Sequence, residues 1–251
     1  MIIPERLSLV SRLALGKSSH PATDAPTDGA MCVMEAVAYV AGEPWSDAPA
    51  CACPVISAFM RAWNDGLPTD ADRVRLLSPL IPRLVGSKST PAVEERRSYL
   101  AFDWLIRVYT PTMLDLVPKL ASHSTALRAL PEIVDLTTAH AVSETVRAAG
   151  AAARAAAWAA DRAAARAVAR AADRAAAWAA GAAARAAAWA AAWAAAGATA
   201  GAAAGAAARA AAGAAARAAA GAAAGAALAP TVATLQASAL DLVDRMLAVT
   251  A

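Results

Sequence analysis

A four-residue repeat between Gly150 and Gly225 constrains the fold of this chain more than any other feature. One position in every four is Gly, Arg or Trp, and the other three are almost always Ala. Ala is the best helix former and Arg is close behind, so we expect residues 151–196 to be helical in almost any context. Gly disfavours a helix interior by up to about 1 kcal/mol, so the Gly-rich part after Gly197 should be helical only where it is packed.

The residue types at the Gly, Arg or Trp position of each four-residue unit also indicate how the repeat arose. Codons that end in GG and differ in their first base encode only Arg, Trp and Gly, which is the whole set found there. The exceptions at the other positions are each one base away from an Ala codon: Asp161, Val168, Asp173 and Thr199. We interpret the stretch as a GC-rich repeat that expanded by slippage and drifted, with a selected functional spacing as the alternative.

The geometry of the repeat limits what such a helix can do. At about 100° per residue, a step of four overshoots a full turn by about 40°, so the Arg and Trp side chains wind around the helix. This pattern predicts neither the seam of a coiled coil nor the single apolar face of a membrane-surface helix. The uncharged span 186–208 is long enough to cross a bilayer, but it lacks the Leu, Ile, Phe and Val side chains that drive insertion. We therefore expect no membrane association.

Composition divides the 251 residues into a compact part and an Ala-rich part. Large apolar residues such as Leu, Ile, Val, Met and Phe lie almost entirely outside the repeat. That part of the chain is long enough to form one helical domain. We expect a compact domain over 1–147, the Ala-rich segment over 148–229, and a C-terminal helix over 230–251 that packs back on the compact domain. The first residues lack the apolar core of a signal peptide, and three Cys residues are an odd count for a disulfide framework. A cytoplasmic, reduced protein is therefore expected.

Apolar spacing, prolines and capping residues predict helices along the compact domain. Residues 31–40 are apolar on all sides apart from Glu35, which predicts a buried central helix. Pro54 suits a first helical position, and the helix that it opens should end at Gly66. The next helix should be capped by Thr69 or Asp70 and interrupted around Pro79 and Pro82.

The remaining helices are predicted in the same way. Pro91 should open a helix to about residue 109, which Pro111 ends or kinks. Pro131 should start a helix that runs into the repeat, and Pro230 should start the last one. No alternating β pattern appears. The predicted fold class is all-α, a compact helical domain with a long Ala-rich helix or helical hairpin and a C-terminal amphipathic helix.

Four segments between Gly29 and about Pro131 carry a resemblance to other proteins. They are MCVMEAVAYVAGEPWSD, CPVISAFMRAWND, LIPRLVG and ERRSYLAFDWLIRVYTPTML. In these segments the chain resembles an uncharacterised bacterial protein family with a helical N-terminal region and a variable Ala-rich C-terminal region. The resemblance implies a bacterial origin, and it brings no catalytic motif.

Three cysteines are the candidate metal ligands. Cys32, Cys51 and Cys53 could supply thiolates, with His20 as a fourth ligand. Structural zinc sites favour Cys pairs two to four residues apart and a second pair, and this sequence has neither. We expect no metal and no cofactor, and we interpret the cysteines as buried free thiols.

Charged residues within apolar helices are the candidate catalytic residues. Glu35, Asp103 and Arg107 are set among apolar neighbours, and Arg61 is placed similarly. Asp103 and Arg107 are four residues apart and can pair along one helix face. Because an unpaired buried charge is costly, these groups should either meet one another in a structural ion-pair network or line a cleft for acid and base chemistry.

Other chemical signatures are weak. His123 and His140 lie near Ser124, Thr137 and Ser143 without the spacing of a nucleophilic triad, and GKSS at Gly16 lacks the upstream glycine-rich loop of a nucleotide-binding motif. Both histidines are expected at the surface.

These observations favour a non-enzymatic helical interaction or structural protein, which binds a protein partner or itself and has an Ala-rich spacer or packing arm. One alternative is a small enzyme or metal-binding domain that uses Glu35, Asp103 and the Cys51/Cys53 loop. A second alternative is non-specific nucleic-acid binding through the repeat, because residues 150–229 carry eight Arg and two Asp, a net charge of +6.

Overall fold

The computed structural model describes residues 1–159 and 225–250 of the chain. This part is 67% helical and contains no strand, which confirms the all-α fold class. Two predictions for the repeat lie outside the described residues: the course of the long Ala-rich helix or helical hairpin beyond residue 159, and the uncharged span 186–208.

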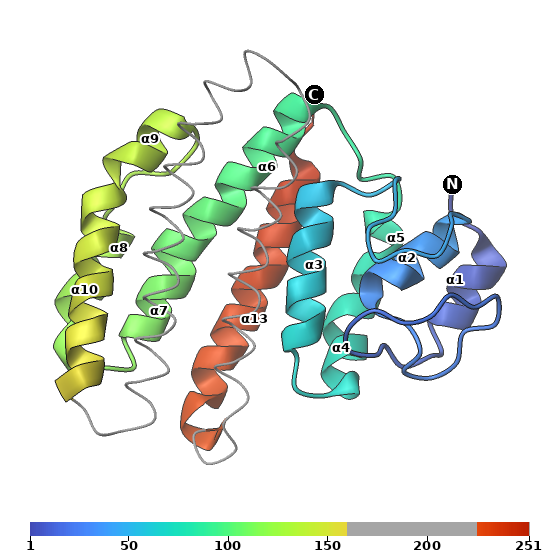
Figure 1. Ribbon diagram of the computed structural model, residues 1–251, viewed down its shortest axis with the longest axis horizontal. Coiled ribbons are helices and arrows are strands. Elements are labelled where there is room, and N and C mark those ends of the chain that lie inside the picture. Colours follow the sequence, from blue (N-terminus) through green and yellow to red (C-terminus); the bar gives the residue numbers. More distant parts are fainter. Residues whose placement is uncertain (160–224, 251) are drawn as a thin grey trace.

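The N-terminal half consists of short helices joined by loops (Figure 1). They are α1 (Pro4–Val10), α2 (Val33–Ala41), α3 (Pro54–Gly66), α4 (Asp70–Leu77), the 3-10 turn η1 (Ser78–Leu80) and α5 (Ile81–Leu84). Pro54 occupies the first turn of α3, as the sequence predicts, and the Thr69 hydroxyl caps α4 by accepting the N–H of Asp72 at 3.1 Å. The prolines of η1 and α5 divide residues 78–84 into single turns.

A continuous helical rod forms the centre of the molecule. It comprises α6 (Pro91–Trp104), a π-helical turn η2 (Leu105–Tyr109) and α7 (Thr110–Leu114). Pro111 has no backbone N–H to donate, and the rod passes it through the wider π turn. In that turn the Leu105 carbonyl accepts both the backbone N–H of Thr110 and its hydroxyl, the latter at 2.7 Å. The predicted interruption at Pro111 is therefore a change of helical pitch rather than an end.

The segment after the rod corrects one prediction. It contains η3 (Pro118–Leu120), α8 (Ala121–Arg128), α9 (Leu136–Ala141) and α10 (Ser143–Ala159). Pro131 does not start a helix, because residues 131–135 are not helical. The helix begins instead after Asp135, whose carboxylate accepts the Thr138 N–H at 2.7 Å in a capping box.

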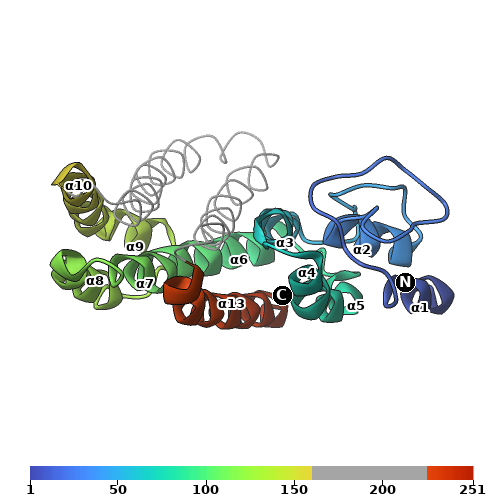
Figure 2. The ribbon, with the colours of Figure 1, turned by 90° about the horizontal axis from the view of Figure 1, so that it is seen from below.

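The last helix, α13 (Gly225–Ala248), also differs from its predicted start. Pro230 lies inside it rather than at its first position. The helix runs antiparallel to α6, since Arg97 Nε donates to the Met246 carbonyl at 2.7 Å and Trp104 Nε1 donates to the Ser238 hydroxyl at 3.1 Å. Figure 2 shows α13 lying along the rod.

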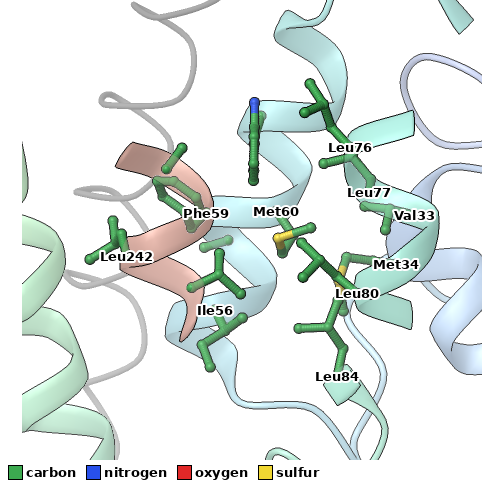
Figure 3. Packing of buried hydrophobic residues seen from close by; sticks show 14 of the residues in the cluster. Val33, Met34, Ile56, Phe59, Met60, Leu76, Leu77, Leu80, Leu84 and Leu242 are labelled. Atoms are coloured by element: carbon green, nitrogen blue, oxygen red, sulfur yellow. The ribbon is translucent and has the colours of Figure 1, made fainter. Parts of the chain in front are cut away.

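Two hydrophobic cores share the rod. The first joins α2, α3, α4, α5 and α13 to one side of α6, and the second joins α8, α9 and α10 to the other side. Trp104 and Leu105 belong to the first core, whereas Phe102 and Ile106 belong to the second. In Figure 3, Phe59 and Met60 of α3 lie between Leu242 of α13 and the leucines of the α4–α5 region.

The beginning of the Ala-rich repeat is part of the second core. Ala149 and Ala153 of α10 are buried, and Ala152 and Ala156 pack against the same cluster. α10 lies against α8. In Figure 1, the end of α10 and the beginning of α13 lie at the same edge of the helical layer. Both ends of the described chain that flank residues 160–224 are therefore anchored in packed helices.

Candidate functional site

Glu35 is the centre of a buried polar cluster at the start of α2. It lies in the first turn of α2 and is 1% exposed. Oε1 accepts the backbone N–H of His20 at 2.6 Å, and Oε2 accepts the backbone N–H of Cys32 at 2.7 Å. Oε2 also lies 2.8 Å from His20 Nδ1. Both oxygens of the carboxylate are thus held by partners from the loop that precedes α2.

Cys32 completes this arrangement as the N-cap of α2. Its sulfur accepts the backbone N–H of Glu35 at 3.5 Å, so the two residues cap one another. Burial, followed by the nearby Glu35 carboxylate, raises the pKa of the Cys32 thiol to about 12. At neutral pH the group is therefore a protonated thiol, which is a poor nucleophile.

The same loop is tied to the end of α3. Asn64 is fully buried; its Oδ1 accepts the Val33 N–H at 3.2 Å, and its Nδ2 donates to the Gly16 carbonyl at 2.9 Å. Asp65 accepts the Ser18 N–H at 2.8 Å. A Cβ atom on Gly16 would lie 2.1 Å from the Gly29 carbonyl oxygen, so only glycine permits this crossing of the loop. The close approach of the loop to Gly29 therefore accounts for the glycine of the GKSS segment, without a nucleotide-binding role.

Asp103 and Arg107 form the ion pair that their spacing predicts. Arg107 Nη1 lies 3.0 Å from Asp103 Oδ1, and Asp103 is 3% exposed. The same carboxylate oxygen accepts the backbone N–H of Ile133 at 2.9 Å. Asp103 therefore fastens the non-helical segment 131–135 to the rod, next to its π turn. Its partners differ from those of Glu35, so the two candidate carboxylates do not form a pair.

The other candidate residues also have local structural partners. Arg61 donates to the Asp47 carbonyl at 2.7 Å, and its side chain is 22% exposed. Ser124 is buried and donates to the Pro111 carbonyl at 3.1 Å. His123 is half-buried rather than at the surface, whereas His140 is exposed.

The cysteines do not converge on a metal site within the described part of the chain. All three are free; Cys32 and Cys53 are buried and Cys51 is half-buried. The backbone N–H of Cys53 donates to the Ser87 hydroxyl at 3.0 Å. Burial first, and the Glu43 carboxylate next, raise the pKa of Cys51. Over residues 1–159 and 225–250, no group of three or more His, Cys, Asp or Glu side chains is placed to hold a metal ion.

The sequence points to Glu35 and to the Asp103–Arg107 pair, but not to the partners of Glu35 or to the bond between Asp103 and Ile133. His20 stands out in the sequence only as a possible metal ligand, and no pattern singles out Asn64. The sequence does carry one indirect signal. A buried Glu35 needs hydrogen-bond donors, and a polar loop directly precedes α2. Spacing could not identify the partners, because they come from a loop without periodicity.

Two further findings bear on function. Within the ranges that the structure describes, no helix is long and apolar enough to cross a membrane. Comparison with protein-family models, with curated proteins and with solved structures finds no match.

Proposed function

We propose that this chain is a non-enzymatic helical interaction or structural protein whose folded body carries the Ala-rich segment as a spacer or packing arm. The observation that supports this most is the role of alanine in α10. Ala149 and Ala153 occupy buried positions against α8, so the repeat enters the fold as a packing surface. The chain returns as α13, which contributes Leu235, Leu242 and Met246 to the first core.

The chemistry of the buried polar groups supports a structural rather than a catalytic role. Glu35 is bonded to two backbone N–H groups and to His20, and Asp103 to Arg107 and a backbone N–H. A general acid or base needs an atom free to exchange a proton with substrate. Both carboxylates instead stabilise loops that have no helical hydrogen bonds of their own.

Small side chains suit an arm that packs by close helix contact. Alanine lets two helix backbones approach closely, and three of every four positions in the repeat are almost always Ala. We take the partner of this surface to be a second copy of the chain. The proposal also places the protein in the cytoplasm, where its three free cysteines stay reduced.

The oligomeric state tests this proposal. Sedimentation equilibrium would compare the full chain with a variant in which a flexible Gly/Ser linker replaces residues 160–224. We expect concentration-dependent assembly of the full chain and a monomer for the variant. If the full chain is also a monomer across the same concentrations, self-association through the arm is excluded. If both assemble equally, the interaction surface lies on the folded body instead.

A further inference from the structure

A basic pocket lies where the loop after α5 meets the beginning of α6 and the end of α13. Its volume is about 360 Å³. The lining residues are Arg83, Val85, Gly86, Ser87, Lys88, Ser89, Arg97, Leu247, Val249 and Thr250. Three of them are cationic, and none carries a carboxylate. The pocket therefore presents positive charge and hydroxyl groups to whatever enters it.

Arg97 gives the pocket a fixed cation. The residue is 4% exposed, and its guanidinium donates to the carbonyls of Ser87 at 2.6 Å, Met246 at 2.7 Å and Val249 at 3.2 Å. These three acceptors are neutral, so they orient the guanidinium without cancelling its charge. A guanidinium has five N–H donors, so three bonds leave capacity for a ligand. An anion in the pocket would compensate a charge that is otherwise costly to bury.

Lys88 and Arg83 supply two exposed cations at the rim. Lys88 Nζ lies 3.2 Å from Glu94, and Arg83 Nη1 lies 2.6 Å from Asp244. The side chains of Lys88 and Arg83 are 52% and 47% exposed. The Arg83–Asp244 pair is exposed on both sides and contributes only about 0–1 kcal/mol, so Arg83 can exchange its carboxylate for a ligand at little cost. Glu94 is buried, so Lys88 keeps its contact with that carboxylate and offers its remaining N–H donors to a ligand.

We propose that this pocket binds a small phosphorylated molecule by its phosphate group. Phosphate accepts several charge-assisted hydrogen bonds, which matches a fixed guanidinium flanked by two exposed cations and the hydroxyl of Ser89. Small-molecule sites typically enclose about 300–1,000 Å³, so the pocket has room for more than the phosphate group itself. The site lies on the folded body and goes beyond the packing role proposed for the Ala-rich arm.

Thermal unfolding and calorimetric titration of the full chain test the site with inorganic phosphate and with glycerol 3-phosphate, at constant ionic strength set by chloride. We expect saturable binding of both probes. Lys88→Gln should raise the Kd about tenfold, because it removes one charge-assisted contact. Lys119→Gln, which changes a lysine outside the lining, should leave the Kd unchanged.

A second pair of variants separates ligand binding from a purely structural role. Asp244→Asn releases Arg83 from its carboxylate and should tighten phosphate binding about threefold. Asp115→Asn breaks the comparably exposed pair of Asp115 with Arg128 and should have no effect. The proposal is overturned if neither probe binds saturably, or if Lys88→Gln and Asp244→Asn leave the Kd of the full chain unchanged.

Discussion

Ala153→Leu would test whether the repeat packs on the folded body. Ala153 of α10 is fully buried in the second core, which also includes Leu120 and Leu127. Leucine would replace its methyl group by an isobutyl group in a space that is already filled. Overpacking of this kind costs about 1–3 kcal/mol. For a folded part of this size, each kcal/mol lowers Tm by about 2–4 °C.

Ala155→Leu is the matched control. Ala155 lies two residues further along the same helix and is exposed. Ala and Leu have similar helix propensities, so this change should alter stability by only about 0.2 kcal/mol. Urea and thermal unfolding followed by circular dichroism at 222 nm would compare both variants with the parent chain. Equal effects of the two substitutions would refute the packed position of α10.

The remaining predictions concern the buried polar groups. Glu35→Ala should lower the free energy of unfolding by about 2–4 kcal/mol, because it leaves two backbone N–H groups without their acceptor. Glu5→Ala, at an exposed position, is the control in the same urea titration. Asp103→Ala should cost more than about 2 kcal/mol, since it strands Arg107 and the Ile133 N–H, and a neutral result in urea unfolding would contradict the bond to Ile133. The raised pKa of Cys32 means that the folded chain keeps a proton that the unfolded chain loses above pH 9.0, so the stabilisation is complete below pH 9.0 and lost as the pH rises toward 12. Unfolding titrations should show this decline in the parent chain and a smaller one in Cys32→Ala.

Local signals in the sequence predict several elements well. Pro54 at a first helical position and apolar side chains at helical spacing identify α3 from Pro54 to Gly66. The all-apolar run with a single charge identifies α2 as a buried helix. In both cases the information lies within the element itself, because capping and periodicity act over a few residues.

Competing signals explain the errors. Pro131 suits a helix start, but the helix begins after Asp135, whose carboxylate caps it. The bond from the Ile133 N–H to Asp103 holds the intervening segment in a non-helical conformation. No periodic apolar pattern predicted α8, since few of its side chains are buried. The π turn next to Pro111 depends on how the rod packs between two cores, which no local pattern encodes.

The candidate site was predictable only in part. A buried glutamate in α2 must find partners, and the sequence shows that requirement. The identity of those partners depends on how the loop 14–32 crosses α2 and α3, which is set by Gly16 and Asn64. The basic pocket was not predictable for the same reason, because Arg83, Arg97 and Thr250 come together only in the folded chain.

The central claim is that the folded helical body holds the Ala-rich segment as an insertion and does not depend on residues 160–224. The most direct test replaces these residues by a Gly/Ser linker of about 20 residues, whose r.m.s. end-to-end distance is about 25 Å. Urea unfolding followed at 222 nm should show one cooperative transition, with Ala153→Leu destabilising this variant as it does the full chain. A variant that is unfolded or aggregated would contradict the claim and show that the fold needs residues 160–224.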